Sequence, residues 1–302
     1  MNLDRVTVPV LPDRRKLDQL FDELYDSMML SNDGPMAEKL SRVLLDVTGG
    51  SHCVLFSSAS TAIEALMEIY SSKTFTVCPY TWVTSISPLM RREANLNCVD
   101  LMEEQPTLCC EDYVLKQKPE TIDYFTHLYG IPNIGSLALP NRCKDKITLF
   151  DGAHALGVKY KNRGVAEFGD ATVFSLHATK GFTGGEGGAV ICSSKSLADS
   201  LLKLSRPIKN QQGLFHGCPR NLRMSEISAG IASLSLERLD EVIELRQSLW
   251  QVYLKNLGSL VVNLEYPETV QSNYLYCVIR LTDEIERSRV QQVLSRNGIG
   301  SR

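Results

Sequence analysis

Short apolar runs alternate with helical patterns along residues 36–205 of the chain. The run 52–57 (HCVLFS) and the helical segment 61–70 form one such pair, and each run is rich in β-branched or aromatic residues. Strands that alternate with helices are typical of parallel strands joined by crossovers. We therefore predict an α/β fold, with further strands at residues 75–78, 96–99, 122–124, 147–150, 171–174 and 188–192.

The pattern changes after residue 205, where a polar stretch with Gly and Pro (RPIKNQQGLFHGCPRN) precedes a long helical pattern. We predict that residues 225–257 form one helix that bridges two domains. The elements predicted beyond it are strands at 261–264 and 274–281 and a helix at 283–296, which begin a small α/β unit.

Composition and charge exclude several classes of protein. Of the 302 residues, 32 are Lys or Arg and 35 are Asp or Glu, so no surplus of positive charge favours a nucleic-acid partner. The chain has no apolar leader and no run near the ~20 apolar residues that span a bilayer, so we expect no membrane partner and a cytoplasmic location. The nine cysteines lack metal or redox spacing, so we expect reduced thiols.

Residues 149–192 carry the most informative set of polar side chains. One predicted strand ends at Asp151, and a later one leads into Ser175, His177 and Lys180 before a Gly-rich turn. Ligands of an open parallel sheet bind beyond the carboxyl ends of its strands, so an acid, a hydroxyl and an amine would converge there. Each residue also has an ordinary explanation: Asp151 as a helix cap, Lys180 as a solvated lysine, and the glycines as a turn.

A second segment, residues 54–66 (VLFSSASTAIEAL), leads a predicted strand into small hydroxyl residues at the start of a helix. Backbone N–H groups there, beside Ser60 and Thr61, can hold a phosphate, although an ordinary N-cap has the same pattern. Together the two segments supply what pyridoxal phosphate (PLP) needs: a helix N-terminus, a carboxylate for the pyridine nitrogen and an amine for a Schiff base. Trp82 follows another strand end, where it can stack on the ring.

These residues lie in motifs with a recognisable order: LSNDGP, SSASTAIEAL, CPYTWVTS, HLYGIPN, FDGAHALG, GDATVFSLHATKGFTGGEGGA and NLRMSEISAG. They resemble the sugar aminotransferases of the DegT, DnrJ, EryC1 and StrS type. The resemblance implies fold type I of the PLP-dependent transferases, with a three-layer α/β/α large domain on a mostly parallel sheet. It implies a large domain at 1–240, with an N-terminal arm at 1–35, and a small C-terminal domain at 241–302 that is incomplete relative to the family.

The resemblance also implies roles for single residues. Lys180 and Asp151 would be catalytic: Lys180 forms the Schiff base and moves the substrate proton, and Asp151 pairs with the pyridine nitrogen. His154 would lie near the ring hydroxyl, and Asn221 would reach the phosphate in a neighbouring subunit, so that a homodimer shares its active sites. The other implied contacts are Ser60, Thr61 and Ser175 at the phosphate, Trp82 on the ring, and, more weakly, Glu186, His127 and Tyr129 at the substrate.

The implied function is transfer of an amino group, from L-glutamate, to a keto group of a nucleotide-linked sugar in amino-sugar biosynthesis. A sugar dehydratase or lyase is a near alternative, but the dehydratases of this family carry His in place of the Schiff-base lysine, and Lys180 is present. A non-catalytic homologue that acts as a binding or regulatory partner is a further alternative. For Glu186, simple turn chemistry explains the residue equally well. The scattered histidines have no metal-ligand spacing, so no metal is expected.

Overall fold

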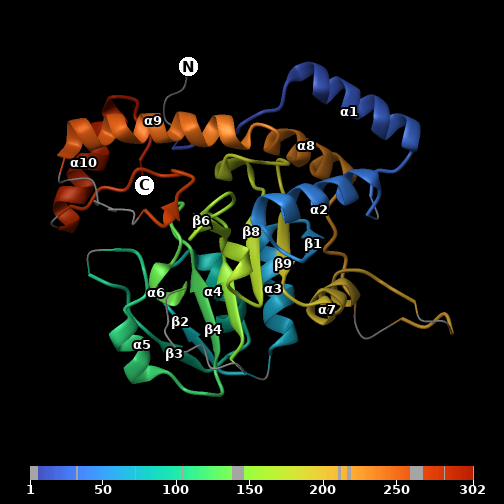
Figure 1. The fold of residues 1–302 in the computed structure, drawn as a ribbon, viewed down its shortest axis with the longest axis horizontal. Helices are drawn as coiled ribbons and strands as arrows, with labels where there is room; N and C mark the ends of the chain where they lie inside the picture. The colour runs from blue at the N-terminus through green and yellow to red at the C-terminus, as the bar shows by residue number, and fades with distance from the viewer. Residues whose placement is uncertain are drawn as a thin grey trace.

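The computed structural model describes residues 6–31, 33–71, 73–103, 105–137, 146–209, 212–215, 219–258, 268–281 and 283–301. Its centre is a seven-stranded sheet with the strand order β1-β9-β8-β5-β4-β2-β3 (Figure 1). The strands are β1 (His52–Phe56), β2 (Phe75–Val77), β3 (Leu96–Cys98), β4 (Ile122–Thr126), β5 (Thr148–Asp151), β8 (Ala171–Ser175) and β9 (Gly188–Cys192). Each lies where an apolar run predicts a strand.

Six strands of this sheet run in one direction, and β9 runs against them. β9 pairs antiparallel with β1 and with β8, whereas the other neighbours pair in parallel. The sheet is therefore mostly parallel, as predicted, but one of its strands is not joined by a parallel crossover. As a result, the carboxyl ends of six strands and the start of β9 meet at the same edge.

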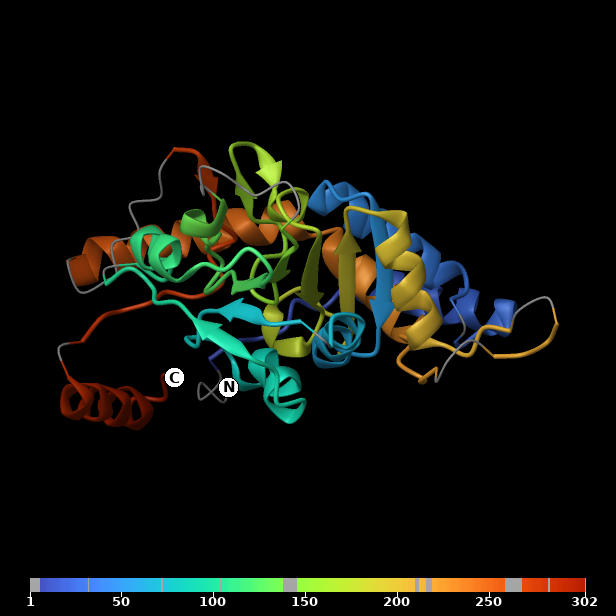
Figure 2. The ribbon, with the colours of Figure 1, turned by 90° about the horizontal axis from the view of Figure 1, so that it is seen from below.

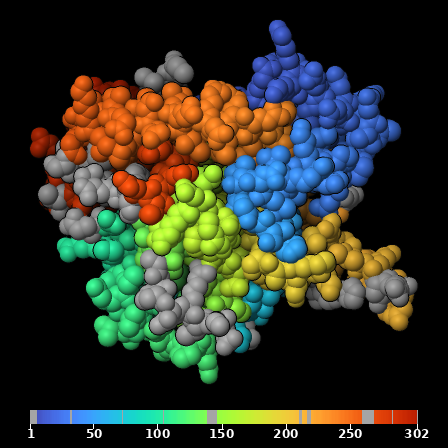
Figure 3. All heavy atoms as spheres, in the orientation of Figure 1, coloured from blue at the N-terminus to red at the C-terminus, as the bar shows by residue number. Residues whose placement is uncertain are grey.

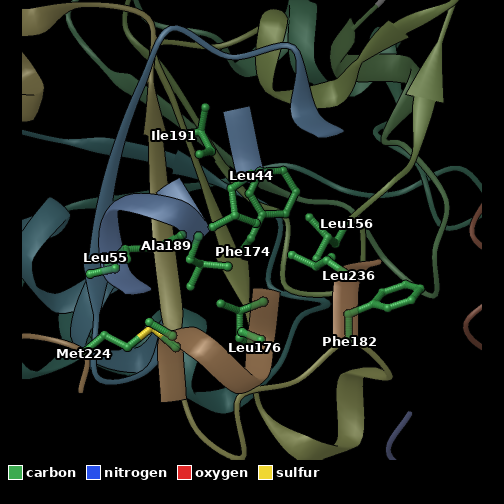
Figure 4. Close-up of a cluster of buried hydrophobic side chains, with 14 of the residues drawn as sticks. Leu44, Leu55, Leu156, Phe174, Leu176, Phe182, Ala189, Ile191, Met224 and Leu236 are labelled. Carbon is green, nitrogen blue, oxygen red and sulfur yellow. The ribbon is translucent and has the colours of Figure 1, made fainter. Parts of the chain in front are cut away.

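Helices cover both faces of the sheet, which gives the predicted three layers (Figures 1 and 2). One face packs against α3, α4 and α7, around buried side chains such as Phe56 and Leu149. The other packs against α2 and α8, around Leu44 and Phe174 (Figure 4). The helices are α1 (Arg14–Ser27), α2 (Pro35–Thr48), α3 (Ala59–Ile69), α4 (Val83–Arg91), α5 (Cys110–Lys116), α6 (Ile134–Leu137), α7 (Lys195–Ser205), α8 (Glu226–Leu236), α9 (Leu239–Leu257) and α10 (Glu284–Arg296).

A buried carboxylate joins two helices of the same layer. Glu226, the first residue of α8, has no exposed surface. Its oxygens accept hydrogen bonds from the backbone N–H groups of Gly34 and Met36, each at 2.8 Å. N–H groups at a helix N-terminus have no partner within their own helix, so Glu226 supplies the cap that the sequence of α2 lacks.

Two predictions for the C-terminal third are wrong. Residues 225–257 do not form one helix, because the chain turns at Glu237 and Arg238 between α8 and α9. This turn lets α9 leave the core: most of α8 is buried, whereas only Val242 and Trp250 are buried in α9. Residues 274–281 form no strand, and Tyr274 has a left-handed backbone with φ 49°. The strand predicted at 261–264 lies outside the described residues.

The segment before residue 276 instead docks on the loops at the sheet edge. Asn273 donates to the carbonyl oxygens of His154 and Leu156, each at 2.9 Å, and Ser272 donates to that of Gly130 at 2.7 Å. A second, three-stranded sheet adds to this attachment; its strands are β6 (Lys159–Tyr160), β7 (Arg163–Gly164) and β10 (Val270–Gln271), in the order β10-β6-β7. These side-chain hydrogen bonds hold the chain just before the residues where the apolar pattern predicts a strand.

Candidate active site

The edge where the six strands end gathers most of the residues that the sequence singles out. It is the side of the sheet on which an open α/β fold binds ligands. The residues at this edge are Ser60 and Thr61 after β1, Trp82 after β2, His127 and Tyr129 after β4, Asp151 and His154 at the end of β5, Ser175 at the end of β8, and Lys180 and Glu186 in the turn before β9.

Asp151 is a buried carboxylate held by two donors. It ends β5 and is 2% exposed. The backbone N–H of Ala153 donates to its Oδ1 at 2.9 Å, and the hydroxyl of Ser85 donates to its Oδ2. Burial raises the pKa of Asp151, while the Ser85 and Ala153 hydrogen bonds and the charge of Lys180 act to lower it. Such a carboxylate suits a partner that brings a proton of its own, as a pyridinium does.

Lys180 ends a short 3₁₀ turn, η2 (Ala178–Lys180), which follows β8. His177 fixes this turn, because its Nδ1 accepts from the backbone N–H of Thr179 at 3.2 Å and its Nε2 lies 3.3 Å from Oε1 of Glu186. Gly181 follows with φ 95°, a conformation that side chains other than glycine's rarely adopt. The Lys180 side chain is half-buried at the sheet edge, where its charge acts on Asp151.

The N-terminus of α3 faces the same edge. Ser58 is its N-cap: the Ser58 hydroxyl accepts from the N–H of Thr61 at 3.1 Å, and the Thr61 hydroxyl accepts from the N–H of Ser58 at 3.1 Å. The ordinary capping role is therefore present, and Ser60 and Ser175 provide further hydroxyl groups there. A Cβ atom at Gly188 would lie 2.4 Å from the backbone nitrogen of Ala59, so the start of β9 passes this helix end only as glycine.

Four aromatic side chains, which we call the aromatic wall, meet around Tyr129 and His154 after strands β4 and β5, and Trp82 is exposed after β2. Trp82 is the N-cap residue of α4 and is 62% exposed, so its ring is accessible for stacking. The backbone N–H of Tyr129 donates to Nδ1 of His154 at 3.2 Å, and their rings stack at 6.3 Å. The Tyr129 and Tyr80 hydroxyls lie 2.6 Å apart, and Tyr276 meets the His154 ring at 5.3 Å. The sequence predictions missed Tyr80 and Tyr276, which join this wall from separate loops.

His127 is a buried residue that the sequence predicts to contact substrate. Its ring has no exposed surface and stacks on Phe150 with ring centroids 4.6 Å apart. Its Nδ1 accepts from the backbone N–H of Asn133 at 2.9 Å. His127 is therefore enclosed by protein and supports the loop after β4 through Asn133, while its contact with substrate stays a prediction.

We expect His127 to make the fold sensitive to acid. Burial lowers its pKa from 6.5 to about 3, so the unfolded chain binds this proton more readily than the folded chain between these values. Stability from this group is complete above pH 6.5 and is lost as the pH falls toward 3. The expected loss is about 1.4 kcal/mol per pH unit, or about 2 kcal/mol at pH 5.

Urea unfolding of wild type and His127→Gln at several pH values measures this effect. Gln keeps a polar side chain but does not titrate, so the free energy of unfolding of His127→Gln should lack this part of the pH dependence. Equal slopes for both proteins below pH 6.5 would show that another group is responsible.

Asn221 is exposed, and the next residue, Leu222, accepts a hydrogen bond from the backbone N–H of Ser57 at 2.7 Å, just before the N-terminus of α3. Oδ1 of Asn221 accepts from Nε of Arg223 at 3.2 Å. Residues 212–215, between α7 and Asn221, project from the body of the molecule (Figures 1 and 3). The exposed amide of Asn221 therefore lies close in the fold to the start of α3.

Comparison with known proteins identifies the family to which this geometry belongs. A model of the DegT/DnrJ/EryC1/StrS aminotransferase family matches residues 13–302. The chain belongs to this aminotransferase family. The predicted family, fold class and aminotransferase activity are thereby confirmed.

Three relatives illustrate the match. The chain is 26% identical over 292 residues to the dTDP-4-amino-4,6-dideoxy-D-glucose transaminase of Shigella dysenteriae. The matched region covers 94% of this chain and 79% of the relative. The chain is also 26% identical over 295 residues to the GDP-perosamine synthase of Escherichia coli O157:H7, over 95% and 81% of the two chains. The structure of DesI with its TDP-sugar product superposes with a TM-score of 0.89 at 26% identity, over 100% of this chain and 79% of DesI.

Aminotransferases of the DegT/DnrJ/EryC1/StrS family use PLP, and the residues at this edge fit that cofactor. The edge offers a buried carboxylate for the pyridine nitrogen, an amine for covalent attachment, a helix start for the phosphate and an accessible indole for the ring face. Among the described residues, no group of His, Cys, Asp and Glu could hold a metal ion. The donor set is that of an organic phosphate cofactor.

Proposed function

We propose that this family member transfers an amino group from L-glutamate to a keto group of a nucleotide-linked sugar. One observation carries the proposal: Lys180, Asp151 and the N-terminus of α3 converge at one edge of the sheet, with the Lys180 charge acting on Asp151. The names of the relatives support the substrate class, since they act on dTDP-linked and GDP-linked sugars or carry a TDP-sugar product.

Bound PLP supplies a cationic ring that withdraws electrons from a substrate attached to it. In this proposal Lys180 binds the cofactor through its amine and, once released, moves a proton at the α-carbon of the amino donor. Asp151 holds the proton on the pyridine nitrogen by charge and hydrogen bonding. Trp82 covers one ring face and excludes water, and His154 orients the ring hydroxyl. Ser60, Thr61, Ser175 and the first turn of α3 bind the phosphate.

Lys180 also favours transamination over sugar dehydration. A dehydratase of this family has no lysine at this position, whereas this chain retains both the amine and the turn that holds it. Glu186 and Tyr129 lie at the mouth of the same edge, where the proposal assigns them to the sugar. If the PLP-loaded protein did not catalyse transamination, a non-catalytic binding role would be indicated.

The visible absorption spectrum of the protein with PLP tests the function. At a pH where the protein is active, we expect an absorption band in the visible range that makes the protein yellow. L-glutamate should convert this band to the near-ultraviolet band of pyridoxamine phosphate. Addition of a 4-keto nucleotide sugar should then restore the yellow band. A yellow band that glutamate leaves unchanged would point to a binding protein, and no band at all would refute PLP binding.

The proposal includes a homodimer, because the amide of Asn221 is exposed and accessible to a second subunit. We propose that Asn221 of each subunit reaches the cofactor phosphate of the other, and that the enzyme works in the cytoplasm. None of the described helices combines the length and apolarity needed to cross a bilayer.

Mixing two inactive variants tests the shared site. Lys180→Ala and Asn221→Ala are each expected to have little activity. Subunits exchanged at random form about half mixed dimers, each with one intact site, so about a quarter of the wild-type activity should return. Native mass spectrometry verifies that subunits have exchanged. If no activity returns after exchange, Asn221 either acts in the same subunit's site as Lys180 or does not take part in the site.

A further inference from the structure

The first turn of α4 places a hydroxyl group against the end of β5. Ser85 is the third residue of α4 and is only 1% exposed. Its backbone N–H donates to the carbonyl oxygen of Trp82, the N-cap residue, at 2.9 Å. The same helical turn therefore fixes Ser85 relative to the indole that is proposed to cover the cofactor ring.

Strand geometry explains why Ser85 meets Asp151. Leu149 and Tyr124 lie in the core on the α3 and α4 side of the sheet, whereas Phe150 lies in a different cluster. Side chains alternate between faces along a strand, so Asp151 shares the face of Leu149. The Ser85 hydroxyl donates to Oδ2 of Asp151 across this interface.

The fold itself has little need of this hydroxyl. A buried serine within a helix commonly bonds back to a carbonyl of its own preceding turn. Ser85 instead donates to a carboxylate that belongs to a neighbouring strand. Alanine has a higher helix propensity than serine and is smaller, so α4 would form as well without the hydroxyl.

Asp151 has few other groups that favour its charged form. Lys180 is the cation that acts on it, and the hydroxyl of Tyr124 lies nearby without a hydrogen bond to the carboxylate. Burial raises the pKa of Asp151, and the Ser85 hydrogen bond acts against burial. Oδ1 already accepts from Ala153, so Ser85 determines how the second oxygen is held.

We propose that Ser85 is a positioning residue, whose hydroxyl holds the Asp151 carboxylate ionised and oriented toward the pyridine nitrogen. This inference rests on the proposed function, since it assigns that partner to Asp151. The first turn of α4 thereby sets two features of the cofactor site together, the ring face through Trp82 and the ring nitrogen through Ser85 and Asp151.

The test compares wild type, Ser85→Ala, Ser85→Thr and Tyr124→Phe, each loaded with PLP labelled with nitrogen-15 in the pyridine ring. The nitrogen-15 chemical shift reports whether that nitrogen carries a proton. In Ser85→Ala we expect the shift to move toward the unprotonated value and kcat to fall about tenfold, the effect of one hydrogen bond to a charged group. KM for glutamate and the urea midpoint should stay near wild type.

Ser85→Thr keeps the hydroxyl and should keep the protonated signal. Tyr124→Phe removes a neighbouring hydroxyl that makes no hydrogen bond to Asp151, so it should resemble wild type in both measurements. A protonated signal and wild-type kcat in Ser85→Ala would overturn the inference while leaving the proposed function intact. An equal loss in Tyr124→Phe would also overturn it, because the effect would then belong to the local polarity. Failure of wild type to bind PLP would overturn the proposed function and the inference together.

Discussion

Replacing Lys180 by Ala is expected to abolish covalent attachment of PLP and to lower transamination by at least about 10⁴-fold. The substitution removes both the amine that binds the cofactor and the base that moves the substrate proton, and each role alone is worth several orders of magnitude. Lys180 is half-buried at the end of a 3₁₀ turn that His177 fixes, so the fold should survive. Borohydride reduction followed by peptide mass spectrometry measures the attachment.

Lys159→Ala is a matched control. Lys159 is an exposed lysine on β6, a strand of the second, three-stranded sheet. It should keep both the reducible attachment and the rate. If borohydride trapped a PLP adduct at another lysine of Lys180→Ala, and that variant also kept its turnover, Lys180 would not have its proposed role.

The second large effect is expected at Asp151, where Asn should lower kcat by about 10²–10³-fold while PLP remains attached. The change removes the charge that stabilises a proton on the pyridine nitrogen, a form of electrostatic stabilisation that is worth this much at other active sites. Stability should not fall, because burial disfavours the Asp151 carboxylate and a neutral amide avoids that cost. Urea unfolding and steady-state kinetics on the same sample separate the two effects.

Asp170→Asn provides the comparison for Asp151. Asp170 accepts from the backbone N–H of Thr148 at 2.7 Å, at the opposite end of the same strand β5. Its substitution should alter stability more than turnover. If Asp151→Asn turned over at the wild-type rate, the pyridine nitrogen would not depend on this carboxylate.

The sheet was predictable because its strands are short apolar runs between helices, and burial of those runs dominates the fold. The direction of β9 was predictable in principle. Residues 176–187 join β8 to β9 through a single short 3₁₀ turn, whereas a parallel crossover usually contains an α-helix. The break between α8 and α9 carries no such signal, since Glu237 and Arg238 are both good helix formers.

The candidate site divides in the same way. Asp151 and Lys180 stand at strand ends, a position that local sequence reveals. Ser85 lies inside a helix, and its hydrogen bond to Asp151 depends on how α4 packs across β5, which no local pattern encodes. Ser272 and Asn273 directly precede the run predicted as a strand, and adjacent Ser and Asn are common in turns, so this polar pair indicates a turn at its start.

The reversed strand β9 has a consequence for the order in which the protein folds. β1 joins the sheet only through β9, and these two strands are far apart in the chain. Because pairing of β1 with β9 closes a long loop of chain, it is slow relative to the formation of local contacts. The N-terminus of α3 therefore reaches Ser175 and Lys180 only after β9 has inserted between β1 and β8. PLP should accordingly bind during refolding only after the parallel strands have formed. The rate at which the visible absorption of bound PLP appears should then report the rate at which β9 inserts into the sheet.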